Sequence, residues 1–212
     1  MFRTHRWIAL LASVALAVGA FAAPEKAAVK RLGKTVVQHR DETVKAVLSW
    51  RYANQTFEKE PWLLLELAFA AERGAVDLNR EDVSLLTPGG ERLALPGQKR
   101  LAEGLKDVRW VEQKASVARD PITGYFPSQR LEQRIPFFAI PGEQIVHDEI
   151  GGGNTMLSRG DLFFEAPTGV WKPGRYTLVL ANKKMNVELP FHLPADDPEK
   201  DVKTGDGKAV PW

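Results

Sequence analysis

TVKAVLSWRY, residues 43–52, is the stretch that decides the fold class, because apolar and polar side chains alternate along it. Every second position is apolar, namely Val44, Ala46, Leu48, Trp50 and Tyr52. Successive side chains of a β-strand point to opposite faces, so a period of two is typical of a strand with one buried face. The stretch therefore predicts a half-buried strand, with Trp50 in the core rather than in a ligand site.

Two segments further along the chain extend the β pattern. Residues 62–71 are apolar on both faces and rich in Leu and Ala, a composition that favours a helix by intrinsic propensity. Their place between two strand-like segments favours a central strand of a sandwich, and a strand is the prediction. Residues 83–87 and 91–95 flank a Pro-Gly-Gly turn at 88–90, so these two runs are predicted to pair as a hairpin.

One amphipathic helix is predicted between Gln98 and Arg119. Its apolar residues recur at spacings of three and four, and Pro121 ends it. The apolar stripe comprises Leu101, Leu105, Val108, Val111 or Glu112, Ala115 and Ala118. We expect this helical insertion to lie across one end or one face of the sheets, with Trp110 off the buried stripe.

The C-terminal half returns to short strands separated by turns rich in Pro, Gly and Asn. The predicted strands there are 135–140, 144–150, 162–165, 175–181 and 185–193. With the four earlier segments this makes about nine strands, and a parallel α/β sheet would need a helix after most of them. The prediction is a mainly β fold, an antiparallel β-sandwich with one inserted helix.

The two ends of the chain lie outside this predicted domain, which spans 34–194. Residues 1–22 read as a cleavable signal peptide: Arg3 and Arg6 precede an uncharged apolar run, and Ala20-Phe21-Ala22 supplies a cleavage site. A retained membrane helix is the alternative, but the run of 17 residues at 7–23 is shorter than the roughly 20 that span a bilayer. Residues 23–33 are predicted to be a leader and 195–212 a flexible tail.

The charge and the cysteine content of the chain limit the classes of partner and of membrane anchor that it can have. The chain holds 29 Lys and Arg against 27 Asp and Glu, and the predicted signal peptide contains two of the Arg and no acid. The mature chain would therefore be neutral, which does not favour nucleic acid as a partner. There is no Cys, so disulfides, cysteine metal sites and a lipid anchor on cysteine are excluded. We expect a periplasmic or secreted protein without a stable membrane anchor.

A resemblance to a known fold lies near the end of the domain, in GDLFFE at 160–165 and GVWKPGRYTL at 169–178. The pair resembles the E-to-F corner of immunoglobulin-like domains, where a Pro-Gly turn precedes a strand with an early Tyr. The resemblance implies an immunoglobulin-like sandwich in which Tyr176 forms a tyrosine corner.

A longer pattern is similar to exported bacterial proteins of uncharacterised role. It comprises REDVSLLTP at 80–88, a helix, RDP at 119–121 and YFP at 125–127. The inserted helix and the missing disulfide depart from antibody-type domains, so only the sandwich architecture is carried over.

No motif predicts chemistry. The Gly-x-Ser-x-Gly signature of hydrolases is absent, and the mature histidines, His39, His147 and His192, are widely spaced and in no metal-binding pattern. We therefore expect no catalytic residue, no metal and no cofactor. His147-Asp148-Glu149, beside a predicted glycine loop at 151–154, is interpreted as a solvated strand end.

Binding residues are easier to nominate. Tyr125 and Phe126 lie adjacent in a loop bounded by Pro and Gly, Trp110 precedes them on the helix, and Arg130 follows. Aromatic faces beside an Arg can hold a sugar ring or a peptide. The alternative is that the aromatics pin the helix to the sandwich. Exposed sheet edges offer a second binding mode, β-augmentation by a partner strand.

Three functions remain open at this point. The first is a non-enzymatic assembly module that contacts an envelope protein. The second is a carbohydrate-binding module, which would need Trp62, Trp110, Tyr125 and Phe126 coplanar and exposed on one face. The third is an enzyme with a dispersed site, which would need His147 or His192 to meet a carboxylate in a pocket.

Overall fold

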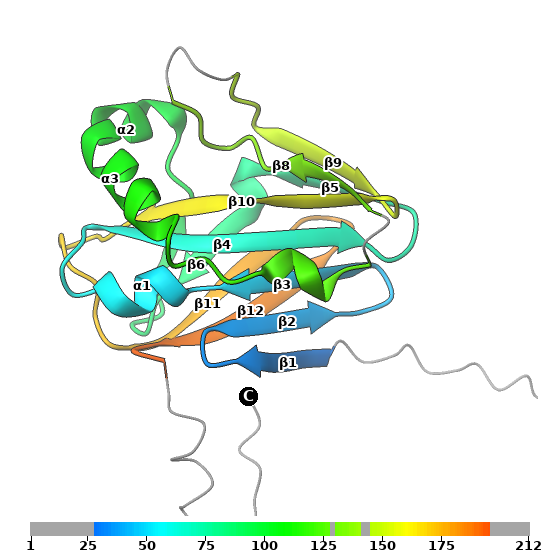
Figure 1. Ribbon diagram of the computed structural model, residues 1–212, viewed down its shortest axis with the longest axis horizontal. Helices are drawn as coiled ribbons and strands as arrows, with labels where there is room; N and C mark the ends of the chain where they lie inside the picture. The colour runs from blue at the N-terminus through cyan, green and yellow to red at the C-terminus, as the bar shows by residue number, and fades with distance from the viewer. Residues whose placement is uncertain (1–27, 128–129, 141–144, 196–212) are drawn as a thin grey trace, which may run out of the picture.

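The computed structural model describes residues 28–127, 130–140 and 145–195 (Figure 1). The predicted signal peptide and residues 196–212 of the predicted tail lie outside this part of the chain. Strands hold 46% of the described residues and helices 19%, which confirms the predicted mainly β class.

The described chain forms twelve strands, where about nine were predicted. The strands are β1 (Ala28–Gly33), β2 (Val36–Arg40), β3 (Val44–Ser49), β4 (Trp62–Ala71), β5 (Ala75–Asn79), β6 (Val83–Leu86), β7 (Arg92–Ala94), β8 (Leu131–Arg134), β9 (Glu149–Gly153), β10 (Met156–Glu165), β11 (Gly174–Ala181) and β12 (Asn186–Leu193). The helices are α1 (Arg51–Thr56), α2 (Gln98–Glu103) and α3 (Leu105–Ala115), with short 3-10 turns η1 (Arg80–Asp82) and η2 (Ile122–Tyr125).

The strands form two large sheets and one small one. The larger has the order β1-β2-β3-β4-β10-β8, the second β12-β11-β6-β7, and β5 pairs with β9 alone. In Figure 1 the six-stranded sheet crosses the view, β11 and β12 pass behind it, and α2 and α3 sit at one end of β4 and β10. The pairing is antiparallel except between β8 and β10, which run parallel.

Strand β4 is the centre of the molecule, because every one of its residues is buried. Its inward side chains, such as Leu65 and Leu67, share one core with Leu178 and Leu189 of the facing sheet. Its outward side chains pack under the helices. A central strand buried on both faces reads as a continuous apolar run, and this confirms strand over helix for residues 62–71.

The stretch at 43–52 is a strand for only part of its length. Strand β3 ends at Ser49, and α1 begins at Arg51. Trp50 is buried as predicted, with its ring centroid 5.3 Å from that of Phe191. The predicted strand end at Tyr52 is wrong, because the first turn of α1 also turns Tyr52 inward.

The predicted single helix is two helices that meet at Gly104. A Cβ at Gly104 would lie 2.7 Å from the ring of Trp62, so the chain approaches β4 more closely there than any side chain allows. The predicted stripe is confirmed, since Leu101, Val108, Val111 and Ala115 are all buried. The predicted end at Arg119 is wrong, because α3 ends at Ala115.

Three other segments differ from their predicted structure. Residues 28–33, predicted as part of the leader, form β1 at a sheet edge, where an exposed strand shows no apolar pattern. Residues 135–140 are irregular although buried, and an Arg80 guanidinium rather than a strand neighbour donates to the carbonyl of Phe137. The glycines at 151–153, predicted as a loop, belong to β9 because they pair with β5.

The hairpin and the Tyr corner follow their predictions more closely. Strands β6 and β7 pair across the turn at 88–90. Tyr176 is buried in β11, and its hydroxyl donates to the carbonyl oxygen of Lys172 at 2.7 Å. This bond is the backward contact expected of a Tyr at the start of such a strand.

Tyr176→Phe should lower the free energy of unfolding by about 1 to 2 kcal/mol, because it leaves the Lys172 carbonyl without its donor. Urea unfolding at neutral pH would measure the change. The control is Tyr125→Phe at a partly exposed position, with an expected change below about 0.5 kcal/mol. Equal stability of Tyr176→Phe and the wild type would mean that the corner bond contributes nothing.

Candidate functional site

A row of polar side chains crosses the outer face of the six-stranded sheet. Register places Glu66 of β4 directly between Ser49 of β3 and Asp161 of β10. On β4 the outward neighbours of Glu66 are Leu64, which packs under the helices, and Ala68, which packs under η2. Two carboxylates therefore face each other across adjacent strands, between two apolar clusters.

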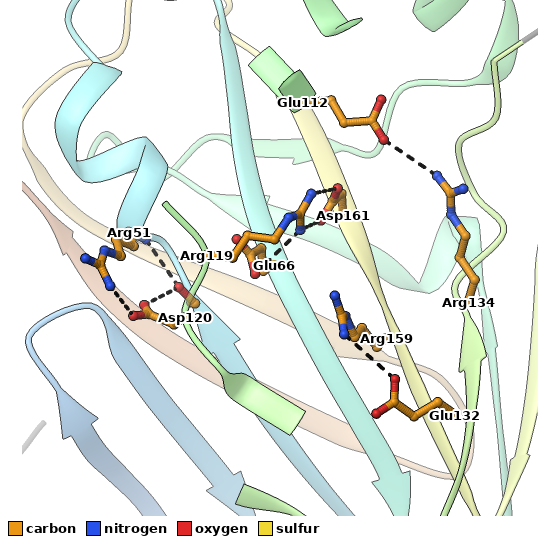
Figure 2. Close-up of polar contacts among 10 residues, drawn as sticks. Arg51, Glu66, Glu112, Arg119, Asp120, Glu132, Arg134, Arg159 and Asp161 are labelled. Carbon is orange, nitrogen blue, oxygen red and sulfur yellow. Dashed lines mark hydrogen bonds and ion pairs between the residues drawn. The ribbon is translucent and has the colours of Figure 1, made fainter. Parts of the chain in front are cut away.

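Arg119 bridges the two carboxylates (Figure 2). Its guanidinium donates to both oxygens of Asp161, at 2.6 and 2.7 Å, and its Nη1 lies 3.6 Å from Oε2 of Glu66. The two parallel bonds to Asp161 make this a bidentate pair, the strongest geometry for Arg and a carboxylate. The Arg119 guanidinium thus interacts with both carboxylates, and its hydrogen bonds go to Asp161 rather than to Glu66.

The next residue, Asp120, anchors the chain to the neighbouring strand. Its carboxylate accepts hydrogen bonds from Ser49 Oγ at 2.7 Å, Thr35 Oγ1 at 3.1 Å and Arg51 Nη1 at 3.1 Å. Arg119 and Asp120 together pin the segment between α3 and η2 across β3, β4 and β10 (Figure 2). This segment holds the helices on the sheet.

Glu66 is held in an environment that disfavours its charge. Only 4% of the residue is exposed. Burial, with a smaller contribution from the nearby Asp161 and Asp120, outweighs the attraction of Arg119 and Arg159 and raises the pKa of Glu66 from 4.5 to about 7. The Glu66 carboxyl therefore changes between its neutral and charged forms close to neutral pH.

A second charged row lies next to the first. Arg159 of β10 and Arg134 of β8 are direct neighbours in the parallel pair. Arg159 Nη1 lies 3.7 Å from Glu132, and Arg134 Nη2 lies 3.9 Å from Glu112 on α3. These side chains, with Arg119 and Asp161, line a hollow of about 380 Å³ between α3 and the edge of the sheet.

Two further hollows continue from it along α3. The first, of about 600 Å³, shares Glu112 and Arg119 with the hollow at the sheet edge. The second, of about 430 Å³, shares Arg109 and Gln113 with the first and is also lined by Trp110. We call the three hollows together the α3 groove.

Trp110 is the aromatic residue of the α3 groove. It is 52% exposed, and the Lys114 ammonium lies 4.2 Å from the centroid of its ring. The other exposed large apolar side chains of the described chain include Val117, Leu131 and Val170, none of which lines these hollows. Trp110 thus offers a large flat contact area in a polar surface.

The other nominated binding residues lie elsewhere. Phe126 is buried beneath η2, with the Lys45 ammonium 5.1 Å from its ring centroid, and Tyr125 is 38% exposed. The Arg130 guanidinium donates to the carbonyl oxygen of Ala71 at 2.9 Å and is largely buried. The prediction of Phe126 as an exposed ligand contact is therefore wrong, because its ring is buried against the six-stranded sheet.

The aromatic platform that a carbohydrate-binding module would need is not assembled. Trp62 is buried under α3, in a different cluster from Phe126. The ring of Trp62 packs against Gly104 instead of facing solvent. Four coplanar exposed aromatics are therefore not present on one face.

The histidines lie on separate elements. His39 is buried on β2, with its Nε2 3.1 Å from Asp41, whereas His147 is exposed before β9 and His192 lies on β12. None of them lines the α3 groove. In the described ranges no group of three or more His, Asp or Glu is placed to hold a metal ion. The helices there are all too short or too polar to cross a membrane.

Sequence reasoning missed most of this site. Glu66 is the one charged residue in the apolar run at 62–71, and a lone acid in a strand buried on both faces signals a partner nearby. Nothing in the sequence identifies that partner as Arg119, because the two are far apart in the chain. Trp110 was found from its position off the apolar stripe.

Comparisons with protein families, with curated proteins and with solved structures found no match. The α3 groove and the polar row are therefore interpreted from their own chemistry.

The free energy of unfolding of the wild type should fall as pH rises, and Glu66→Gln should prevent that fall. A raised folded-state pKa means that the folded protein holds more protons than the unfolded chain between pH 4.5 and about 7, so stability falls across that window. We expect the variant to gain on the wild type by up to about 3 kcal/mol between pH 5 and pH 8. Urea unfolding of both proteins at each pH would measure it.

The control is Glu132→Gln, which removes an exposed acid from the same face of the sheet. Its stability difference from the wild type should stay within about 0.5 kcal/mol from pH 5 to pH 8. A Glu66→Gln profile parallel to that of the wild type would show that Glu66 is not the group that titrates.

Proposed function

We propose that this protein is an exported, non-enzymatic binding module that works in the cell envelope by holding a protein partner in the α3 groove. The observation that carries the proposal is the exposure of Trp110 beside hollows that continue into a charged surface. Exposed Trp and Arg are the residues that most often dominate the binding energy of protein interfaces.

The construction of the α3 groove supports binding rather than motion or chemistry. Helix α3 is fixed on one side by its buried stripe and at its end by Arg119 and Asp120. A contact surface on a rigid helix loses little conformational entropy when a partner binds. The half-exposed Trp110 has only two side-chain torsions to restrict.

Export is supported by the N-terminal sequence. Residues 1–22 combine a basic start, an uncharged apolar run and a small-x-small site. A periplasmic or secreted location follows from that pattern, and an envelope protein is the partner that such a location makes available.

Carbohydrate binding and catalysis have less support. The buried Trp62 and Phe126 leave Trp110 without a coplanar aromatic neighbour from the set that a sugar platform would need. The proposal includes a relationship to immunoglobulin-like domains. The feature that supports this relationship is the hydrogen bond from the Tyr176 hydroxyl to the carbonyl oxygen of Lys172.

Trp110→Ala should abolish partner capture. The mature protein would be tagged, crosslinked gently in its native host and purified, and co-purifying chains would be identified and quantified. We expect the wild type to recover one envelope protein in stoichiometric amount, and Trp110→Ala to recover at least about tenfold less, since an interface Trp contributes about 2 kcal/mol or more.

Tyr125→Ala is the matched control, because it removes a partly exposed aromatic side chain outside the α3 groove. It should capture the partner like the wild type. Loss of capture in Tyr125→Ala but not in Trp110→Ala would move the contact to the loop at 121–127. No stoichiometric partner for the wild type would contradict the proposal.

The mature chain should begin at Ala23. N-terminal sequencing of protein recovered from the periplasm or the medium would test this. A chain that starts at Met1 and fractionates with the membrane would show that residues 7–23 are retained as an anchor.

A further inference from the structure

One face of the Trp110 ring is covered by a neighbouring side chain, and the ring also borders a hollow. Trp110 and Lys114 lie one helical turn apart, and the Lys114 ammonium lies 4.2 Å from the ring centroid. At that distance the ammonium covers one face of the ring. Lys114 lines none of the three hollows of the α3 groove, whereas Trp110 lines the hollow at the N-terminal end of α3. A ligand in that hollow therefore meets the ring away from Lys114.

The hollow beside Trp110 follows one side of the helix. Its lining residues are spaced three and four apart, so they lie on the same side of α3: Leu105, Lys106, Arg109, Trp110 and Gln113. We call it the Trp110 hollow. Its volume of about 430 Å³ lies within the range of roughly 300 to 1,000 Å³ that is usual for ligand sites, so a bulky side chain can enter it.

The Trp110 hollow is open toward the rest of the α3 groove. It shares Arg109 and Gln113 with the next hollow along the helix. An occupant is therefore not limited to the size of one small molecule, because its chain can continue along α3. This continuity favours a segment of a protein, with one side chain in the Trp110 hollow and the neighbouring residues beside the helix.

Two residues give the Trp110 hollow an apolar wall. Leu105 is partly buried and packs against the cluster beneath the helices, and Trp110 is 52% exposed. A large aliphatic or aromatic side chain placed between them would stack on the indole ring and remove apolar surface of both residues from water. The wall therefore favours a large apolar side chain over a short polar one.

The charge around the Trp110 hollow selects what lies next to that side chain. Two basic residues line the hollow and no acidic one does, since the exposed acids Glu103 and Asp107 lie outside it. Arg109 already interacts within the protein. Lys106 is exposed, and among the residues that the structure describes it has no hydrogen-bond or ion-pair partner. A carboxylate beside the hollow would pair with Lys106, and a basic group would be repelled by it.

We propose that the Trp110 hollow holds a large apolar side chain of the partner protein, flanked in the partner's sequence by a carboxylate that pairs with Lys106. This rests on the proposed function and names the chemistry of the partner. Lys114 restricts the indole from the opposite face, so the ring loses less freedom when the partner side chain stacks on it.

The test uses a blocked hexapeptide with a central Phe-Leu pair and two Glu on each side as the probe. NMR would follow the indole N–H signal of Trp110 in the isotope-labelled mature protein, assigned by its loss in Trp110→Phe. We expect a saturable shift of this signal that weakens as salt is raised. The same peptide with Ser-Ser at its centre should bind at least about tenfold more weakly, because the apolar contact is lost.

Lys106→Glu tests the charge. It should bind the Glu-flanked peptide at least about fivefold more weakly than the wild type, because an attraction becomes a repulsion. It should also bind a Lys-flanked Phe-Leu peptide that the wild type does not bind. The matched control is Lys99→Glu, which makes the same change of charge at an exposed lysine of α2 outside the α3 groove, with an affinity within about twofold of the wild type.

Several results would overturn the inference. They are the absence of a saturable shift at Trp110, equal binding of the Glu-flanked and Lys-flanked peptides by the wild type, and equal weakening by Lys106→Glu and Lys99→Glu. Two other occupants have their own signatures. A Trp110 signal that moves on dilution without peptide would indicate a second copy of the chain, and one that is lost with phosphatidylglycerol vesicles but unmoved by peptide would indicate a lipid surface.

Partner capture separates this inference from the function on which it rests. If Lys106→Glu captures the same envelope protein as efficiently as the wild type, while Trp110→Ala does not, the inferred partner chemistry is wrong and the binding function stands. If the wild type captures no partner, the binding function itself fails, whatever the peptides do.

Discussion

The burial of both faces of β4 is the constraint on which the remaining structure depends. Leu65 and Leu67 of β4 face the second sheet, which makes the sandwich. Trp62 and Leu64 face the other way and would be left in water without α2 and α3. Large apolar side chains on the outward face require a cover, so the helical insertion is part of the core and not an appendage. The close approach of Gly104 to Trp62 shows how tightly that cover fits.

The cover is held at its centre by charge. Glu66 and Asp161 face each other on adjacent strands, and Arg119 descends from the end of α3 to meet both. Replacing such a group by apolar side chains often costs a protein nothing in stability. What the structure shows of this group is that its bonds join the segment after α3 to β4 and β10. Asp120 adds three hydrogen bonds, from Ser49 at the end of β3, Thr35 in the turn before β2 and Arg51 at the start of α1. The fixed segment then orients α3 so that Trp110 faces away from the sheet.

Much of the fold could be predicted, because local pattern reports burial directly. The strand at 62–71 was predicted from its place between two strand-like segments, the hairpin of β6 with β7 from its Pro-Gly-Gly turn, and the buried helical stripe from apolar spacing. Two of the errors share a cause: an irregular buried segment such as 135–140 is as apolar as a strand, and an exposed edge strand such as β1 is as polar as a leader. The apolar content of a segment indicates whether it is buried. Whether a buried segment is a strand depends on whether its backbone N–H and C=O groups form hydrogen bonds with a neighbouring strand.

The sequence by itself determined the mainly β class of the fold and placed Trp110 off the apolar stripe of its helix, since each depends on residues close together in the chain. Only the tertiary structure decided that Glu66 meets Arg119 and that Arg134 lies beside Arg159. Those pairs join strands and turns that are distant in sequence, and their meeting depends on sheet order and register. The pattern of residues along the chain does not indicate sheet order or register, because register is set by the packing of all the strands together.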